Sequence, residues 1–473
     1  MSEIKVVERD ASDFEFSIPV LIAGAGACGL TAALAAHDAG ADVLVLERDA
    51  KPFGSTGMSY GAICAAGTRK QQEAGIQDTG EALAEDIIAA TKGQTDPDYA
   101  ARVARQSGPT VDWLIEQHGL SLELEVGWTG FGHRVPRLHA PANRTGEELM
   151  SMLQNAVSAA AIDILTEARL TTLYKGGDGR VTGVGVTRPD GSTEEIACDN
   201  LILATCGFGA NHEMVARFAP DIANADYYGH ESNEGDGILL GQQMGGVLAD
   251  MGAYQALGAL ATPYNLVIPH VILIGGGVQI NALGKRFENE LHNISGQALT
   301  ILEQPGGYCW MVTNEALHED ALGRFDEYRQ AVAMGAVRSA ETPRDLAALM
   351  KVPPETFEAE IAGVVELART GKTDEFGRDF SNALPLEGRL YATKVRGALF
   401  HTQGGLVVNE RAQVVRQDGT AIPNLYAGGG AARGLAGPGN WGYLPGAGLM
   451  MAVTLGRIAG EEAAKSVTQT TGS

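Results

Sequence analysis

The pattern Gly24-x-Gly26-x-x-Gly29 carries the clearest chemistry in the chain, because it could bind a pyrophosphate. Gly24 permits a tight turn, Gly26 lets the backbone approach the phosphates, and Gly29 lets a helix pack closely on a strand. The N–H groups that begin that helix add positive potential. An acid, Glu47, follows and could accept hydrogen bonds from ribose hydroxyls. The pattern predicts dinucleotide binding. The residues assigned to the nucleotide are Gly24, Gly26, Ala27, Cys28, Gly29, Glu47 and Arg48.

A second loop, residues 54–61, is dense in glycine and hydroxyl side chains. Its N–H and O–H groups could be donors to the edge of a flavin, although a plain surface loop would have the same composition. Only one dinucleotide fingerprint is present, whereas a flavoprotein that also holds NAD(P) in a second nucleotide fold usually carries two. The residues assigned to the flavin from this loop are Ser55, Thr56, Gly57, Met58, Ser59 and Gly61.

The segments around these loops alternate as a parallel sheet requires. Residues 19–23 are an apolar run, 29–39 a helix of small residues, and 42–47 a second buried strand, which predicts a β-α-β unit. Residues 76–118 are expected to be helical. The helix starts expected there are Thr79, Asp96 and Thr110.

The pattern changes twice further along the chain. Three short strands with turn residues between them predict an antiparallel meander, followed by a buried strand at 201–204. The meander strands are expected at 168–174, 181–187 and 193–197. Residues 272–400 are richer in helix, with starts at Thr342-Pro343 and Pro353-Pro354. Because glycine-rich motifs recur after residue 404, we expect a discontinuous first domain, 1–271 and 401–473, with 272–400 inserted.

Composition excludes several classes of protein. The net charge of −23 disfavours nucleic acid and anionic membrane surfaces as partners. The five cysteines are odd in number and lack C-x-x-C spacing, which favours free thiols in a reducing compartment. No secretory signal or apolar run of membrane-spanning length occurs, so a cytoplasmic protein without a membrane span is expected. The spacing of His, Cys and carboxylates predicts no metal site.

The order of the glycine-rich motifs gives a resemblance over nearly the whole chain, roughly residues 18–465. The motifs lie at 24–29, 54–57, 204–209, 235–237, 284–290, 401–406, 425–429 and 456–460. In this order they resemble the fumarate reductase/succinate dehydrogenase flavoprotein superfamily, including the 3-ketosteroid dehydrogenases.

The resemblance implies an α/β fold: a Rossmann-like FAD-binding domain of the glutathione-reductase type with an inserted α+β capping domain. It implies FAD and a substrate sandwiched between isoalloxazine and cap. Relatives with covalent FAD attach it through a His in the loop after the second strand; residues 54–61 contain none, so noncovalent FAD is expected. It extends the cofactor residues to Thr205, Gly207, Asp236, Gly428, Gly429, Gly446, Gly448 and Leu449.

Members of this superfamily differ in the substrate carbon that exchanges a hydride with the flavin. Dicarboxylate enzymes need arginines, one in the cap and one near the C-terminus, because a buried carboxylate must be matched by cations. By offset from 456–460, Tyr443 stands where the C-terminal arginine would be. The segment resembles the ketosteroid dehydrogenase end, where a tyrosine and a backbone N–H hold the substrate ketone. A phenol and an amide form an oxyanion hole that favours an enolate. Tyr443 and the N–H of Ala447 are the candidates, and a packed tyrosine is the alternative.

The resemblance therefore implies an FAD-dependent oxidoreductase (EC 1.3 type) acting on the CH–CH group next to a carbonyl, by desaturation of a neutral, cyclic or steroid-like ketone or the reverse enone reduction. The proton-handling base stays open among His401, His292 and Tyr308. His133-Arg134 resembles a substrate-side loop. One alternative is a reductase of a carboxylated alkene, which would need Arg286, Arg396 or Arg433 at the flavin. Another is a flavin-binding electron-transfer module. The electron partner is not identified by the sequence.

Overall fold

The computed structural model describes residues 4–127 and 129–471, which fold into two compact units. The first unit holds the described residues up to Ala219, together with Gly229–Tyr254 and the described residues from His401 on. The second holds Pro220–Tyr228 and Gln255–Phe400. The sequence places the boundary at residue 272 instead. The difference arises from strand pairing, because β11 (Asp226–Tyr227) and β13 (Tyr254–Ala261) both lie beside strand β18 of the second unit's sheet.

The first unit is built on a mixed nine-stranded sheet. Its central strand, β10 (Thr193–Leu203), pairs in parallel with β2 (Ser17–Ala23) along one edge. Along its other edge β10 pairs antiparallel with β9 and then parallel with β21 (Ala421–Ala427). The main path of strands is β1 (Lys5–Glu8), β8 (Arg169–Lys175), β9 (Val181–Thr187), β10, β2, β3 (Val43–Leu46) and β7 (Asp163–Leu165), with β20 (Gln413–Val415) paired to β21.

The predicted meander is present, but the two strands expected at 193–197 and 201–204 are one continuous strand. Asp199 and Asn200 interrupt the apolar pattern, yet the backbone there still pairs with β2, with Cys198 opposite Ile18 and Asn200 opposite Val20. Asn200 is buried and its side-chain oxygen accepts a hydrogen bond from Ser466.

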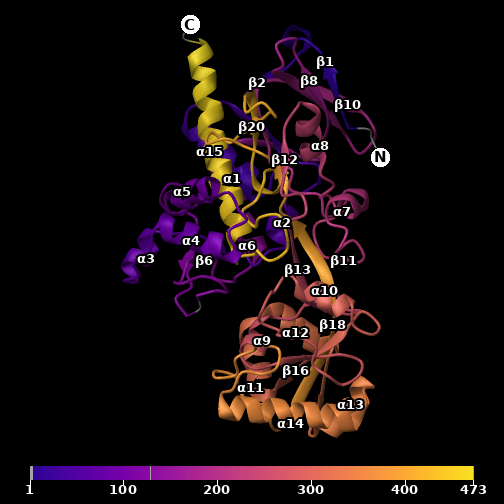
Figure 1. Ribbon diagram of the computed structural model, residues 1–473. Coiled ribbons are helices and arrows are strands. Elements are labelled where there is room, and N and C mark those ends of the chain that lie inside the picture. Colours follow the sequence, from indigo (N-terminus) through magenta and orange to yellow (C-terminus); the bar gives the residue numbers. More distant parts are fainter. Residues whose placement is uncertain (1–3, 128, 472–473) are drawn as a thin grey trace. The chain divides into compact units, whose positions relative to one another are not determined.

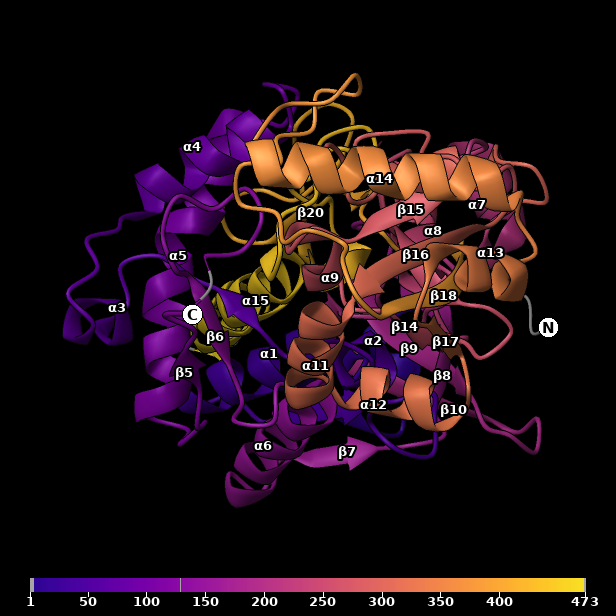
Figure 2. The same ribbon diagram turned by 90° about the horizontal axis from the view of Figure 1, so that it is seen from below.

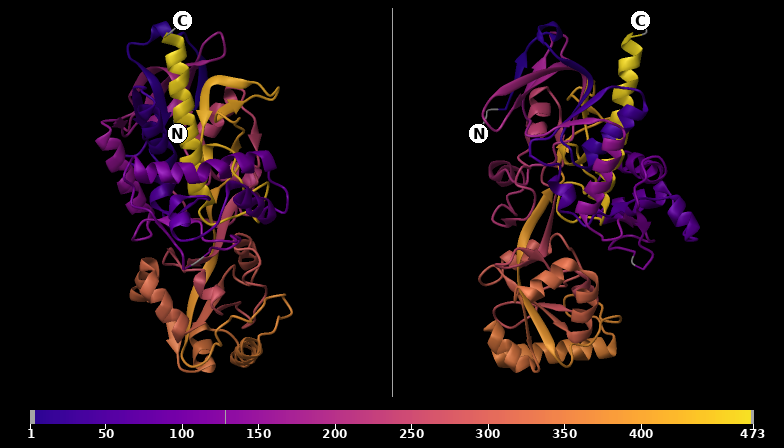
Figure 3. Two further views of the ribbon diagram at one scale, coloured as in Figure 1. Left: turned by 90° about the vertical axis from the view of Figure 1, so that its left-hand side faces the viewer. Right: turned by 180° about the vertical axis from the view of Figure 1, so that it is seen from behind.

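Strands β2 and β3 and helix α1 (Ala27–Asp38) form the predicted β-α-β unit. Helix α15 (Ala447–Thr471), one uninterrupted helix in Figure 3, packs along α1 (Figure 1). Glycine makes this approach possible: a Cβ on Gly456 would lie 2.4 Å from the Cys28 carbonyl oxygen, and one on Gly460 2.2 Å from that of Ala32. The two helices therefore run in the same direction with their backbones almost in contact.

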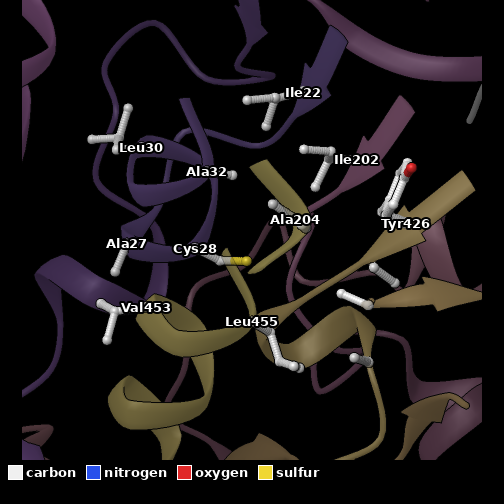
Figure 4. Packing of buried hydrophobic residues seen from close by; sticks show 14 of the residues in the cluster. Ile22, Ala27, Cys28, Leu30, Ala32, Ile202, Ala204, Tyr426, Val453 and Leu455 are labelled. Carbon is white, nitrogen blue, oxygen red and sulfur yellow. The ribbon is translucent and has the colours of Figure 1, made fainter. Parts of the chain in front are cut away.

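The core of the first unit lies between these helices and the sheet. Helix α1 is buried along its first ten residues, Ala27–Ala36. In Figure 4 the Cys28 side chain lies between α1, Leu455 of α15 and the end of β10, while Ile22 and Ile202 come from the two central strands. Small apolar residues on α1 thus let the longer side chains of its neighbours fill the core.

The helices α4 (Gly80–Ala90) and α5 (Pro97–Glu116) occupy most of the segment predicted to be helical, and they lie side by side (Figures 1 and 2). Their expected caps are confirmed: Thr79 accepts from Ala82 N–H and Asp96 from Asp98 and Tyr99 N–H. The start expected at Thr110 is wrong, because α5 continues through Pro109. Apolar residues buried before and after Pro109 keep one packed face along the whole helix. They are Val103, Ala104, Val111 and Leu114.

Shorter elements complete the first unit. Its further helices are α2 (Gly54–Gly57), α3 (Arg69–Glu73), α6 (Gly146–Ala159), α7 (His212–Phe218) and α8 (Asp236–Gln243), with 3-10 turns η1 (Ala11–Asp13) and η2 (Gly429–Ala431). Two small sheets pair β4 (Ile63–Cys64) and β5 (Glu123–Leu124) with β6 (Leu138–Ala140), and β12 (Leu248–Ala249) with β19 (Gly405–Leu406).

The second unit has its own sheet and core. Its strands are β14 (Leu266–Val267), β13, β18 (Leu390–Thr402), β16 (Cys309–Asn314) and β15 (Val278–Ile280), with β11 and β17 (Val337–Ala340) paired to β18. Its helices are α9 (Val271–Ile274), α10 (Gln297–Leu302), α11 (Glu315–Arg324), α12 (Asp326–Ala333), α13 (Pro343–Met350) and α14 (Pro354–Thr370). As Figure 2 shows, α14 lies across this sheet, and its Phe357 and Ile361 pack with Trp310 of β16. The predicted starts at Thr342-Pro343 and Pro353-Pro354 are confirmed.

All five cysteines are free, and each except Cys206 is buried. Within the described residues, no helix is both long enough and apolar enough to cross a membrane.

Acid is expected to destabilise the first unit through His139 of β6. This ring is fully buried, with Nδ1 2.9 Å from the Arg137 carbonyl oxygen and Nε2 2.9 Å from the Thr68 hydroxyl. Burial lowers its pKa to about 4 from the usual 6.5. Between those values the unfolded chain binds a proton that the folded chain does not, so stability falls as pH falls. We expect the free energy of unfolding to fall by about 1.4 kcal/mol per pH unit more steeply than in His139→Gln. Parallel curves from pH 6.5 to 4.5 would contradict this.

Candidate functional site

The glycine loop before α1 fits between strand ends that leave no room for side chains. Gly24 has φ +108°, and a Cβ there would lie 2.4 Å from the Ala204 carbonyl oxygen at the end of β10. A Cβ on Gly29 would lie 1.8 Å from the carbonyl oxygen of Gly24 itself. Two of the three roles that the sequence pattern assigns to its glycines, those of Gly24 and Gly29, are therefore matched by turn and packing geometry.

The N–H groups of this loop divide into those already bonded and those that are not. Ala25 N–H donates to the Glu47 carboxylate and Ala27 N–H to the Thr56 hydroxyl, each at 3.0 Å. The N–H groups of Cys28 and Gly29 have no hydrogen-bond acceptor among residues 4–127 and 129–471. Since they begin α1, they are suited to an anion.

The acidic residues near the loop already take part in hydrogen bonds and ion pairs within the chain. The Glu47 carboxylate also accepts from Asp49 N–H at 3.0 Å, and burial raises its pKa. Arg48 lies 3.0 Å from Glu234 and 3.9 Å from Asp236, while Asp236 accepts two bonds from Arg169, at 2.8 and 3.0 Å. The fold therefore brings Arg48 and Asp236 together, although they are distant in sequence.

Residues 54–61 form a compact turn beside α1. The Ser59 hydroxyl donates to the Thr56 carbonyl at 2.7 Å and accepts from Gly61 N–H at 3.0 Å, so it is used within the loop. A Cβ on Gly57 would lie 2.5 Å from the Phe53 ring, and Met58 is 41% exposed. The Ser55 hydroxyl accepts from Asn233 at 2.8 Å.

The segments after β10 and β21 close around the same loop. Cys206 has φ +64°, unusual for a residue with a side chain, and its thiol lies 3.4 Å from the Ser55 hydroxyl. A Cβ on Gly428 would lie 2.6 Å from the Cys28 sulfur. A Cβ on Gly429 would lie 3.2 Å from the Cys28 Cβ.

Hydroxyl side chains fix the turn that follows β10. The Thr205 hydroxyl accepts from Gly237 N–H at 3.2 Å, and the Thr402 hydroxyl accepts from Phe208 N–H at 3.0 Å. A Cβ on Gly207 would lie 2.3 Å from that Thr402 oxygen. Sequence reasoning missed Asn233 and Thr402. Thr402 lies within the 401–406 motif and Asn233 lies just before the 235–237 motif, and those positions were the available signal.

The first turn of α15 is the second place where backbone N–H groups are available. Gly446 has φ +77° and accepts from Cys64 N–H at 3.3 Å. Ala447 N–H donates to the Leu444 carbonyl at 3.1 Å, so the amide expected to pair with Tyr443 is already bonded within its own turn. The N–H groups of Gly448 and Leu449 have no acceptor in the described part of the chain.

His401 lies beside this turn. Its ring Cε1 is 3.8 Å from the position that a Cβ on Gly448 would take, and its Nδ1 is 3.4 Å from the Thr402 carbonyl oxygen. Burial lowers the pKa of the imidazole below its usual value, so it is neutral at pH 7. Tyr443, partly buried, belongs to the segment that leads into the same turn. His401, Tyr443 and Ala447 are thus gathered near the start of α15.

The other two candidate bases, His292 and Tyr308, belong to the second unit. His292 is exposed. The Lys394 ammonium lies 3.8 Å from the centre of the Tyr308 ring, and the ring also packs against that unit's core. Their role in proton transfer stays a prediction.

All three arginines considered for a carboxylate substrate have carboxylate partners. Arg433 lies 2.6 Å from Asp250 and 3.4 Å from Asp96. Arg396 lies 3.1 Å from Asp226. Arg286 is buried, with Glu290 at 2.8 Å and Asp374 at 2.6 Å. Arg286 and Glu290 therefore form a buried ion pair within the second unit.

These features fit an extended dinucleotide. Unbonded N–H groups stand at the start of α1 and at the start of α15, and the two helices run in parallel. Cys28 lies against Gly456 of α15. At 1.5 Å per residue, the first residue of α15, Ala447, therefore lies about 13 Å from the level of Cys28 along the axis of α15. Phosphates at α1 and a flavin edge at α15 would each find donors.

Comparison with known proteins agrees with this geometry. The model of a family described as "FAD binding domain" matches residues 19–449. An NADH:fumarate oxidoreductase from Klebsiella pneumoniae (strain 342) is 29% identical over 453 residues, which are 95% of this chain and 48% of the relative. The chain therefore spans about half the length of that relative.

Two solved structures share the fold. The open conformation of a flavocytochrome c3 fumarate reductase is 28% identical, with a TM-score of 0.83 over 97% of this chain and 80% of that one. A 3-ketosteroid-Δ4-(5α)-dehydrogenase from Rhodococcus jostii RHA1 has a TM-score of 0.76 over 97% of this chain and 99% of that one; at 24% identity it shows the fold alone.

Proposed function

This chain belongs to the FAD-binding domain family, whose members similar to it are oxidoreductases acting on CH–CH groups, and from that premise we propose what it acts on. The substrate is a neutral carbonyl compound, cyclic or steroid-like, and a C=C bond is made or removed next to its carbonyl. FAD, bound without a covalent link, supplies the two-electron acceptor or donor for this chemistry.

The ion pairs of Arg286, Arg396 and Arg433 are the observation that carries this proposal. A substrate carboxylate that leaves water needs a cation whose charge is not already matched. Each of these guanidinium groups already faces a carboxylate of the chain, so a second carboxylate would gain little from it. A ketone oxygen carries no charge, so it needs only hydrogen-bond donors.

Two donors are proposed for the ketone oxygen. The Tyr443 phenol would donate one hydrogen bond, and the unbonded N–H of Gly448 replaces that of Ala447 as its partner. Together they would stabilise the negative charge that develops on the oxygen as the neighbouring carbon loses a proton. His401 lies beside Gly448 and is neutral at pH 7, so it can accept that proton.

A second candidate, reduction of a carboxylated alkene, is favoured by the relatives. By name, the Klebsiella protein is an NADH:fumarate oxidoreductase and the flavocytochrome c3 is a fumarate reductase. That function would require an arginine to exchange its internal carboxylate for the substrate.

Anaerobic flavin spectroscopy separates these candidates. Oxidised holoprotein is mixed with saturated cyclic ketones, and photoreduced holoprotein with cyclic enones, fumarate or other carboxylated alkenes. We expect ketones to bleach the flavin absorbance, or enones to restore it. Restoration by the carboxylated alkenes alone would establish the second candidate. A flavin that responds to no small substrate would indicate an electron-transfer module and refute both.

A further inference from the structure

Among the described residues, the side chain of His133 makes one hydrogen bond, which joins it to the segment that leads into α15. The side chain is only 8% exposed, and its Nε2 lies 3.0 Å from the Pro445 carbonyl oxygen. Because a carbonyl only accepts, Nε2 must carry the hydrogen. The ring's Nδ1 has no partner in the part of the chain that the structure describes. Burial lowers the pKa of His133 to about 4, so the ring is neutral at pH 7.

The Pro445 carbonyl is the acceptor that α15 would use if it began earlier. Met450 N–H donates to the Gly446 carbonyl at 3.0 Å, which is the first i to i−4 bond of this end. The next bond back would join Leu449 N–H to Pro445. In the structure His133 donates a hydrogen bond to that carbonyl, and the left-handed φ of Gly446 turns the chain out of the helix. The Leu449 N–H has no acceptor in the described part of the chain.

The loop that carries His133 is itself held in place. Gly130 and Gly132 have φ of +82° and +80°, and a Cβ on Gly132 would lie 3.1 Å from a methyl group of Leu444. On the other side of His133, Arg134 donates its N–H to Asp86 of α4 at 3.1 Å and its Nε at 2.7 Å. The histidine is therefore fixed between a glycine-rich turn and an ion pair.

We propose that His133 is a positioning residue, which holds the Pro445 carbonyl and thereby keeps the N–H group of Leu449 available to the flavin. This inference rests on the proposed assignment of the first turn of α15 to the flavin. Donors and a helix N-terminus at that place favour the negative charge of a reduced flavin. His133 thus acts on the cofactor through Pro445 without touching it.

The variants His133→Asn and His133→Gln test the hydrogen bond. The Gln amide nitrogen reaches the position of Nε2, whereas that of Asn stands near Nδ1 and cannot reach Pro445. We expect H133N to bind FAD about threefold to tenfold more weakly, the range of one lost hydrogen bond, and H133Q to stay within twofold of the wild type. Binding is measured by quenching of flavin fluorescence on the apoprotein. A tenfold selective loss for reduced flavin would lower the potential by about 30 mV.

The matched control is His139→Gln, at a buried neutral histidine of the same unit whose ring nitrogens bond Thr68 and Arg137; its FAD affinity should equal that of the wild type. Wild-type affinity and potential in H133N would refute the proposal. Equal losses in H133N and H133Q would also refute it, because His133 would then contribute only its shape.

A measurement on the wild type keeps the test independent of folding in the variants. Hydrogen exchange of peptides covering residues 446–452 should slow when FAD is added to the apoprotein, and unchanged exchange would overturn the proposal. None of these readouts needs a substrate. Failure of the ketone experiments would therefore leave this inference standing, and unchanged FAD binding in an active H133N would reject this inference alone.

Discussion

Replacing Tyr443 with Phe should leave FAD bound and lower turnover by about 100-fold to 1,000-fold. The substitution removes one hydroxyl, and a single oxyanion donor is typically worth about 2.7–4 kcal/mol of transition-state stabilisation. The loss should fall on the rate of flavin reduction by saturating ketone, because the phenol is proposed to bind the developing negative charge more strongly than the ground-state carbonyl.

Anaerobic stopped-flow reduction measures that rate directly. Tyr264→Phe is a matched control, since it also removes one hydroxyl, which bonds the Gly335 carbonyl at the surface of the second unit. The control should react as the wild type does. A Tyr443→Phe rate within threefold of the wild type would show that this hydroxyl is not an oxyanion donor.

Replacing Gly29 with Ala should abolish FAD binding and destabilise the first unit. The added methyl group would lie 1.8 Å from the Gly24 carbonyl oxygen, a backbone atom that cannot move without moving the loop itself. Overpacking of this kind costs about 1–3 kcal/mol and occasionally more. The displaced loop would also carry away the unbonded N–H groups of Cys28 and Gly29.

The control is Gly363→Ala, in the exposed middle of α14, where an added Cβ meets nothing within 4 Å. That change should stabilise the helix by about 0.5–1 kcal/mol. Thermal unfolding and the flavin-to-protein absorbance ratio report both effects. A Gly29→Ala protein that is yellow and as stable as the wild type would contradict the loop geometry.

Local features of the fold could be predicted because short-range rules govern them. The β-α-β unit follows from apolar runs around Gly24–Gly29, and the helix starts at Thr79 and Asp96 follow from side chains that can accept backbone N–H bonds. The FAD assignment follows from the same loop and is supported by the family match.

Features that depend on distant segments could not be predicted in this way. Pro109 does not end α5, because packing on both sides of it outweighs the local preference. The second unit takes in Pro220–Tyr228 because β11 pairs with β18, a contact between segments about 170 residues apart. The Ala447 N–H is bonded within a turn, and the Pro445 carbonyl of that turn accepts a hydrogen bond from His133. No spacing rule in the sequence relates His133 to this turn.

The central claim is that the Tyr443 phenol, and no arginine guanidinium, donates a hydrogen bond to the substrate oxygen. The most direct measurement uses photoreduced holoprotein and a pair of substrates matched in ring and double bond, cyclohex-2-enone and cyclohex-1-ene-1-carboxylate. We predict that the enone reoxidises the flavin at least 100-fold faster than the carboxylate at equal concentration. Faster reoxidation by the carboxylate would contradict the account.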